Sequence, residues 1–215
     1  GAERRAVKRT PPQATAAASL STHRHLAWHF TAARDRSGAL IFRDPRRFGG
    51  VSSYASMDAL RETAWGALGP DALTIDAPTL ALRLRGARAI KAALLDQAVL
   101  AGVGNIYADE ALFRARVRPT RRAGALTHEE IECLATALRS VLASAVQHDG
   151  STLRDYRAPR GQPGRAQLLH AVYGRAGELC LACRCKLRHM RLAGRTTTWC
   201  PTCQRASRTP AGRER

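Results

Sequence analysis

The sequence predicts a multidomain α+β protein, with short strands first, helices in the middle and a metal-binding β-hairpin near the C-terminus. Three observations predict this order: β-type segments between residues 23 and 73, helical periodicity from residue 76, and two Cys-X-X-Cys pairs from residue 180 onward. The chain has 215 residues, of which 45% are hydrophobic. That fraction is enough to bury a sizeable core, and it excludes a wholly disordered chain.

The N-terminal third is expected to hold short strands. Residues 1–22 are basic, rich in alanine and without hydrophobic periodicity, and they predict a flexible lead-in. After them, HLAWHF, GALIFRD and GGVSSYA have the composition of strands separated by polar turns. The Gly-Pro step in LGPDAL at residues 68–73 is expected to close this β region.

The middle of the chain is expected to be helical. Helical runs are predicted from the N-cap Asp76 and over residues 89–100 and 105–116. Thr127 and Glu130 form a capping box that opens a long amphipathic helix, which Gly150 ends. Cys133 is expected to be a small buried residue beside its apolar face. Residues 150–170 are rich in Gly, Pro and Arg, and they predict a long, functional loop.

The charge of the chain points to a nucleic-acid partner. Lys and Arg number 35 against 17 Asp and Glu, which gives a net charge of +18. A GC-rich genome favours Arg codons, but it adds acidic residues as readily and does not explain this imbalance. Phosphates attract such a surface and release counterions on binding. No apolar stretch is long enough to span a membrane, and no signal peptide is visible, so the bacterial cytoplasm is the expected location, with DNA as the anchor to the nucleoid.

Two cysteine pairs predict one structural zinc ion. Cys180 and Cys183 form the first pair and Cys200 and Cys203 the second, with residues 184–199 between them. This is the spacing of a four-cysteine zinc site, although Cys185 could replace Cys183 as a ligand. Disulfides are the alternative, and the absence of a secretion signal argues against them. Four thiolates leave no open position for catalysis, so the ion would fold a small basic hairpin suited to DNA, or to contacts with proteins or the ribosome.

Several motifs occur in a recognisable order. They are FRDPRRFGG (42–50), LGPDAL (68–73), IKAALLDQAVLAGVGNIYADEALF (90–113), VYGR (172–175) and WCPTCQ (199–204). Together they resemble the formamidopyrimidine-DNA glycosylase and endonuclease VIII family of base-excision repair enzymes, and its formamidopyrimidine branch more closely. The resemblance implies a partial β-sandwich over 23–73, a helix–two-turn–helix domain over 74–173, a zinc finger over 174–205 and a basic tail over 206–215.

The resemblance also implies which residues hold DNA. Asn105, in the GNIY motif, would hold a phosphate of the lesion strand, and Arg195 of the zinc finger would contact a phosphate near the lesion. Lys91 matches a family lysine near the lesion and its phosphates, although a helix lysine is equally often a simple exposed residue. Tyr107 and Tyr173 match positions near the bound strand.

The glycines of the GVGN turn have a role of their own. Gly102 and Gly104 would let the backbone approach the DNA closely, and free amides at a helix start are good anion donors. A helix cap with two turn glycines is the plainer interpretation, but it does not explain the whole GVGNIYADE string.

The DPRRFG segment resembles the family loop that fills the gap left by a flipped base. Arg46 would take the place of the extruded nucleotide, Arg47 would touch phosphate and Phe48 would wedge into the stack. A surface turn with two arginines is the simpler interpretation. The loop at 150–170 matches the loop that covers the flipped base.

The catalytic residues of the family have no counterpart in this sequence. Family catalysis uses an N-terminal Pro as a Schiff-base nucleophile, an adjacent Glu and a β-hairpin Lys, whereas this sequence begins GAERRAV. The expected activity is therefore that of a glycosylase and abasic-site lyase acting on oxidised purines in a complete protein. The alternative is a zinc-dependent module that binds damaged duplex DNA without cutting it. In both cases a monomer on DNA is expected.

Overall fold

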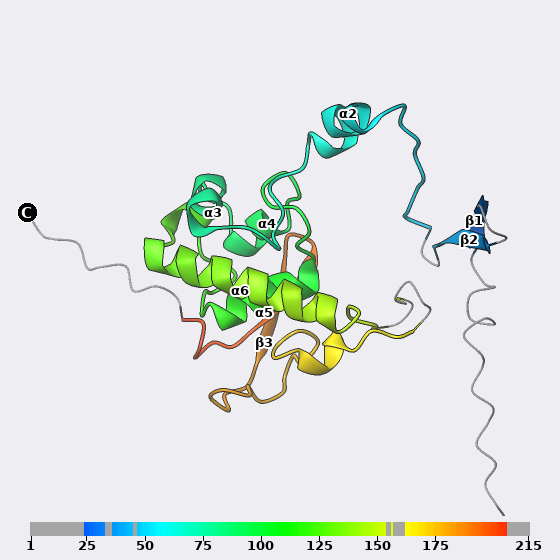
Figure 1. Cartoon of the computed structure of the whole chain (residues 1–215). Helices are drawn as coiled ribbons and strands as arrows, with labels where there is room; N and C mark the ends of the chain where they lie inside the picture. The colour runs from blue at the N-terminus through cyan, green and yellow to red at the C-terminus, as the bar shows by residue number, and fades with distance from the viewer. Residues whose placement is uncertain (1–23, 33–35, 45–46, 154–155, 157–161, 206–215) are drawn as a thin grey trace, which may run out of the picture. The chain divides into compact units, whose positions relative to one another are not determined.

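The computed structural model describes residues 24–32, 36–44, 47–153, 156 and 162–205. They divide into two compact units, one formed from residues up to 52 together with 152–164, the other from 53–151 and 165 onward. The predicted lead-in, the basic tail, Arg46 and residues 154–155 and 157–161 of the predicted 150–170 loop lie outside the described residues. Figure 1 labels the elements used below.

The first unit is built on a β-hairpin. Strands β1 (Arg24–Ala32) and β2 (Arg36–Arg43) pair antiparallel, with Trp28 opposite Leu40. They confirm the strands predicted from HLAWHF and GALIFRD. The described residues of this unit form one two-stranded sheet, so the second layer that a β-sandwich requires is not among them. Leu40 is 58% exposed and Trp28 37%, so this sheet buries little apolar surface.

The third predicted strand is wrong. Residues 49–55 hold no strand, and the chain runs instead into the short helix α2 (Met57–Leu60), which continues as one wide turn over η1 (Arg61–Trp65). Ser56 explains this switch because its side chain accepts a hydrogen bond from the amide of Ala59 and so caps α2.

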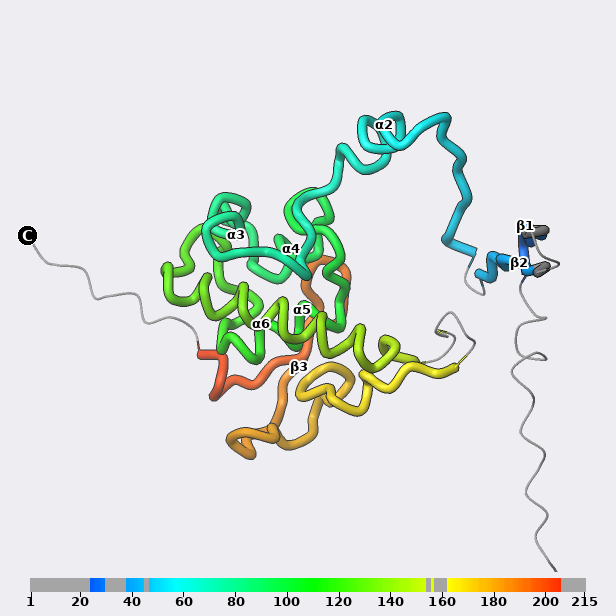
Figure 2. The backbone as a smooth tube through the Cα atoms, viewed as in Figure 1, coloured from blue at the N-terminus to red at the C-terminus, as the bar shows by residue number. Residues whose placement is uncertain are grey.

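Four helices of the second unit, whose path Figure 2 traces, pack around the larger of two clusters of buried apolar residues among its described residues. The helices are α3 (Ala77–Arg83), α4 (Ile90–Leu94), α5 (Asn105–Arg114) and α6 (His128–Gln147). Asp76 caps α3, and Thr127 with Glu130 forms the predicted capping box of α6. The long helix α6 packs against α3 and α5 (Figure 1), burying leucines at positions 80, 94, 112, 134 and 138.

Two helical predictions need correction. The run expected over 89–100 is helical only for Ile90–Leu94, because Ala89 forms an antiparallel bridge with Arg122 and turns follow Leu94. Cys133 is exposed, not buried. The buried face of α6 runs through Ile131, Leu134 and Leu138, and residue 133 lies outside that stripe.

The C-terminal hairpin is docked on the helices and belongs to the same unit. Strands β3 (Arg188–Leu192) and β4 (Arg195–Trp199) pair antiparallel around Ala193 and Gly194, whose φ values of 48° and 71° form a tight two-residue turn. Strand β4 packs against α5. The residues expected to form a zinc finger, 174–205, belong to the same compact unit as the helices.

The difference in burial between the units predicts a difference in local stability. We expect amides of β1 and β2 to exchange with solvent much faster than those of α5 and α6, because local opening is easiest where few apolar contacts hold the backbone. Hydrogen exchange read by mass spectrometry over residues 23–73 and 76–175 measures this. Equal protection of the two ranges would contradict the prediction.

No helix in the described part of the chain has the length and apolar character needed to cross a lipid bilayer.

Candidate nucleic-acid interface and metal centre

Four cysteine side chains converge beside the β3–β4 hairpin. The Sγ atoms of Cys180, Cys183, Cys200 and Cys203 all lie within 4.8 Å of one another. This spread fits four thiolates placed about 2.3 Å from one tetrahedral zinc ion. Cys180 and Cys200 are buried, and they form a small core with Val172 and Leu187. These residues can hold a structural metal ion, and they leave no position open on it.

Cys185 lies outside the cluster. Its Sγ contacts the carbonyl oxygen of Lys186 at 3.9 Å, and the metal cluster does not include it. The backbone amide of Cys185 donates to Cys183 and lowers the pKa of that thiol to about 7. Of the two candidates that the spacing left open for the fourth ligand, the geometry favours Cys183.

The N-terminus of α5 carries backbone amides that no side chain caps. Gly104 is the N-cap residue, and it supplies no side chain to the free amides of the first turn. A Cβ at Gly104 would meet nothing within 4 Å, so there is space in front of these amides. Free amides and the helix dipole together favour a phosphate at this place. Gly104 fits the prediction that the backbone is open to close approach.

Asn105 is the first residue of α5 and lies beside that space. Its Nδ2 donates to the carbonyl oxygen of Thr196 in strand β4 at 3.1 Å. Its Oδ1 is buried and has no hydrogen-bond partner among the described residues. Oδ1 is a hydrogen-bond acceptor, so the group that would satisfy it is a donor such as water, and not a phosphate oxygen. Asn105 thus joins the helix start to the cysteine-bearing hairpin.

The turn before Asn105 is held by one side chain. Gln97 accepts the amide of Gly102 at 2.9 Å and donates to the carbonyl oxygen of Val103 at 3.1 Å. Gly102 has φ +91°, which a residue with a Cβ adopts only with strain. Residues 69–72 pack against 97–101 through backbone hydrogen bonds, such as that from Gly69 to Gln97 at 2.8 Å. The LGPDAL motif therefore packs against the segment that precedes the GVGN turn. The prediction that this motif closes the β region is wrong.

A substitution at Gly69 tests this support. A Cβ there would lie 2.6 Å from the backbone of Val99, so Gly69→Ala must displace main chain. We expect a loss of about 1–3 kcal/mol in the free energy of unfolding, measured by urea denaturation followed by circular dichroism. Gly104→Ala is the matched control because its Cβ has open space, and it is expected to cost under about 1 kcal/mol. Equal losses would show that the close approach at Gly69 is unimportant.

Lys91 is completely buried, so the interpretation of it as an exposed helix lysine is wrong. Its Nζ lies 2.7 Å from Oδ1 of Asp109, whose side chain is also buried. The same Nζ donates to Oγ1 of Thr197 at 2.8 Å and to the carbonyl oxygen of Thr196 at 3.1 Å. Burial lowers the pKa of Lys91 and raises that of Asp109 to about 6, and each charge opposes the shift of the other.

Arg195 lies at the start of strand β4 with an exposed side chain. It directly precedes Thr196, whose carbonyl oxygen binds both Lys91 and Asn105. The structure therefore brings three predicted residues, Lys91, Asn105 and Arg195, to one short segment of the hairpin.

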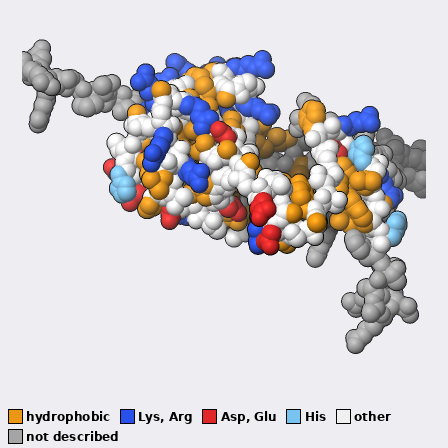
Figure 3. All heavy atoms as spheres, turned by 90° about the horizontal axis from the view of Figure 1, so that it is seen from above, with side chains coloured by type: hydrophobic (Ala, Val, Ile, Leu, Met, Phe, Trp, Pro, Cys, Tyr) orange, Lys and Arg blue, Asp and Glu red, His pale blue; other side chains and the backbone are white. Residues whose placement is uncertain are grey.

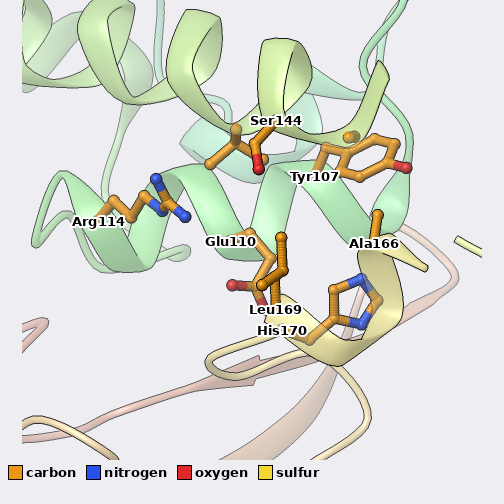
Figure 4. A pocket seen from close by; sticks show the side chains of 9 residues that line it. Tyr107, Glu110, Arg114, Ser144, Ala166, Leu169 and His170 are labelled. Carbon is orange, nitrogen blue, oxygen red and sulfur yellow. The ribbon is translucent and has the colours of Figure 1, made fainter. Parts of the chain in front are cut away.

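One predicted tyrosine, Tyr107, lines a small pocket (Figure 4), and the other, Tyr173, packs against the lining residue His170. Tyr107 on α5 and His170 line it, and Ser151 links them, with its Oγ 3.4 Å from the Tyr107 hydroxyl and 3.0 Å from His170 Nε2. The Tyr173 ring packs edge-on against His170, with centroids 5.6 Å apart. Burial lowers the pKa of His170, which favours its neutral form. Both tyrosines are half-buried and hold the region after α6 against α5.

Two acidic residues of α5 were missed as parts of the site. Asp109 binds Lys91 and accepts the amide of Thr198 at 3.1 Å. Glu110 is 3% exposed, and its carboxylate accepts the three successive amides of residues 171–173 at 2.8–2.9 Å. Adjacent acids in an otherwise apolar helix were the signal for them, because a buried carboxylate needs partners.

The DPRRFG segment lies in the first unit, and its position relative to the second unit is not defined. Arg46 lies outside the described residues. The side chain of Asp44 accepts the amide of Arg47 at 2.9 Å and that of Gly49 at 2.5 Å, and Arg47 has φ 57°. Phe48 is 82% exposed. Asp44 therefore builds a tight turn that presents Phe48 outward, as a wedge requires.

Basic side chains are widely spread over the surface. Figure 3 shows Lys and Arg at many points of one face and Asp and Glu at few. This distribution agrees with the net charge of +18. It adds a sequence-independent attraction for phosphate to the specific groups around Asn105.

Comparison with known proteins agrees with this geometry. Residues 68–157 match the family model described as the formamidopyrimidine-DNA glycosylase H2TH domain. The chain is 49% identical over 169 residues to the formamidopyrimidine-DNA glycosylase of Thermomicrobium roseum, an alignment that covers 77% of this chain and 58% of that protein. The chain thus spans less than two thirds of that relative.

Two solved structures resemble the fold closely. The MutM (Fpg) protein of Thermus thermophilus has a TM-score of 0.69 at 44% identity, covering 86% of this chain and 73% of that one. The Fpg of Lactococcus lactis in complex with DNA containing an abasic site has a TM-score of 0.75 at 32% identity, covering 86% and 68%. The chain belongs to the formamidopyrimidine-DNA glycosylase family, as its motifs predict.

Proposed function

We propose that this chain binds duplex DNA at abasic sites and oxidised purines, as the DNA-holding part of a base-excision repair glycosylase. The observation that carries the proposal is the meeting of Asn105 and the segment after Arg195 at one carbonyl group, beside an open helix N-terminus. The solved Lactococcus lactis Fpg is bound to DNA with an abasic site, which supports the choice of ligand.

Zinc is the metal we propose for the four-cysteine cluster. Its role is structural, because four thiolates complete a tetrahedral site and leave no room for substrate. The ion would fix the two ends of the β3–β4 hairpin and so hold the strand that carries Arg195. The chain's own side chains, rather than the ion, would contact the DNA phosphates.

Two further segments complete the proposed DNA-binding site: one would insert into the duplex and the other would cover the flipped base. In this proposal Arg46, Arg47 and Phe48 act on the duplex where the base leaves it, and the loop over 150–170 covers the flipped base. The exposed Phe48 supports such a role, since an apolar side chain can replace lost stacking.

Binding is tested with a duplex that carries a tetrahydrofuran abasic analogue, compared with the same duplex intact. We expect the zinc-loaded chain to bind the abasic duplex at least about tenfold more tightly in fluorescence anisotropy, a difference of about 1.4 kcal/mol. Asn105→Ala and Arg195→Ala should each weaken this binding. Arg83→Ala removes the same charge from the exposed end of α3 and is the matched control. Equal affinity for both duplexes would contradict the proposal.

Catalysis is tested by borohydride trapping on duplexes with 8-oxoguanine or an abasic site. Binding without a covalent adduct would support the alternative of a module that binds damaged DNA without cutting it. An adduct would show that a reactive amine is present and would replace the binding-only alternative with lyase chemistry. We further propose that the protein is a monomer and is located in the bacterial cytoplasm. Light scattering measures the mass in solution, and a monomer should give 23.3 kDa.

A further inference from the structure

We propose that Lys91 positions the phosphate-binding groups by holding strand β4, and does not itself contact DNA. The inference rests on the proposed function and deepens it, since it assigns a role to a buried residue behind the interface. Lys91 is 0% exposed, so its ammonium group cannot reach a phosphate without a rearrangement of the hairpin.

The contacts of Lys91 lead to both predicted phosphate ligands. Thr196 is the first link, because its carbonyl oxygen accepts Lys91 Nζ at 3.1 Å and Asn105 Nδ2 at 3.1 Å. Thr197 is the second, because its Oγ1 accepts Lys91 Nζ at 2.8 Å and donates to the carbonyl oxygen of Arg195 at 3.5 Å. One ammonium group thus fixes the Asn105 amide and the backbone of Arg195 together.

Asp109 completes this arrangement from the helix side. Its Oδ1 pairs with Lys91 at 2.7 Å, and its Oδ2 accepts the amide of Thr198 at 3.1 Å. The pair therefore binds three successive residues of β4, Thr196 to Thr198. A buried pair of this kind adds little net stability, but it specifies one register of the packed elements. Here the register decides where Arg195 lies relative to Asn105.

The hairpin has a second buried anchor that provides a matched control. Gln204 is 0% exposed, and its side chain accepts the amide of Cys200 at 2.9 Å and donates to the carbonyl oxygen of Val117 at 2.9 Å. It fastens the cysteine end of the hairpin to the residues after α5, whereas Thr196 lies near the hairpin turn. With zinc retained, we expect loss of this anchor to weaken the docking of the cysteine end and to leave the segment that carries Arg195 in place.

The test is a double-mutant cycle between Lys91 and Arg195, read as DNA affinity at several salt concentrations. We expect Lys91→Met, with its zinc retained, to weaken binding of the abasic duplex about tenfold. The slope of log affinity against log salt should fall by about 0.9, the value for one lost phosphate contact. In an Arg195→Ala background the same substitution should cost clearly less affinity than in the wild-type chain, because only the loss through the neutral Asn105 remains, and the slope should not change further.

Three outcomes would overturn the inference. A further loss of slope in the Arg195→Ala background would mean that Lys91 itself contacts phosphate. Wild-type affinity for Lys91→Met would mean that the position of the hairpin does not matter. The third outcome is that Lys91→Met and Gln204→Met lower the DNA affinity equally, each additively with Arg195→Ala. That result would mean that Lys91 only stabilises the fold and does not position Arg195.

A second variant keeps the test decisive if Lys91→Met fails to fold or to bind zinc. Thr197→Val removes only the hydroxyl that joins Lys91 to Arg195, and it should show the same lack of additivity with a smaller loss of affinity. Additive behaviour of Thr197→Val would contradict the inference. The same cycle can be measured on an intact duplex. If the chain shows no preference for abasic DNA, the proposed function is overturned, but the coupling between Lys91 and Arg195 on the intact duplex still tests this inference.

Discussion

Removal of the metal should abolish DNA binding. With a chelator present, the hairpin between Cys180 and Cys203 is expected to unfold, because the binding free energy of a structural zinc ion, about 10–16 kcal/mol, is also folding energy for a small domain. The core around Cys180 and Cys200 holds only Val172 and Leu187 as further fully buried members among the described residues. Because this cluster is small, we expect the ion to supply most of the stability of the cysteine end of the hairpin.

The loss of the hairpin should affect both halves of the interface. Arg195 would no longer be held, and Asn105 and Lys91 would lose their partners on Thr196. We expect affinity for the abasic duplex to fall by more than about 100-fold, equal to about 2.7 kcal/mol or more. Anisotropy titrations before and after chelation measure this, and restoration by added zinc shows that the change is reversible.

Cysteine variants identify the ligands. Cys183→Ser should lower the zinc content well below one ion per chain, measured by elemental analysis, and should reduce DNA binding with it. Cys185→Ser is the matched control because its thiol lies outside the cluster, and it should retain the ion. The reverse pattern, with zinc lost from Cys185→Ser and kept in Cys183→Ser, would contradict the ligand set.

Local features of this fold were readable from the sequence. The cysteine pairs, the cap at Asp76 and the capping box at Thr127 depend on residues a few positions apart, and all appear where predicted. The strand expected over 49–55 failed because residues around Ser56 favour a helix cap, a competing local signal of similar strength. Residue patterns alone predict the secondary structure of such short segments poorly.

Long-range contacts decided the rest of the site. Lys91 and Thr197 meet across 106 positions of sequence, and nothing near Lys91 indicates a buried lysine. Its two possible environments, an exposed helix face and the lesion, were both suggested by pattern or resemblance. The structure shows a third, in which a carboxylate on α5 neutralises the charge. Buried ion pairs of this kind become visible only when the elements are packed.

The pair of Lys91 and Asp109 also predicts a large effect on stability. Asp109→Asn keeps an oxygen for the Thr198 amide but leaves the Lys91 ammonium buried without its counter-charge. Breaking a buried pair in this way typically costs about 3–5 kcal/mol, so we expect a loss of that size in the free energy of unfolding at neutral pH. Urea denaturation of the zinc-loaded chain, followed by circular dichroism, measures it.

Two further variants show whether charge is the cause. Lys91→Met combined with Asp109→Asn removes both charges and should recover about 2 kcal/mol relative to Asp109→Asn alone. Asp58→Asn breaks an exposed pair with Arg61, whose side chains are 82% and 64% accessible, and it should cost under about 1 kcal/mol. Equal stability of the single variant Asp109→Asn and the double variant would contradict a charge-coupled pair.

The pH dependence of stability gives an independent view of the same carboxyl group. Burial raises the pKa of Asp109 from its ordinary 3.8 to about 6, so between these values the folded chain holds a proton that the unfolded chain has released. The contribution of Asp109 to the free energy of unfolding therefore falls as the pH rises through this window, and it levels off above about 6. Asp109→Asn cannot titrate and should lack this component, so the difference between wild type and variant should vary with pH between about 4 and 6 and become constant above it. A constant difference across the whole range would mean that Asp109 keeps an ordinary pKa and that Lys91 fully offsets its burial.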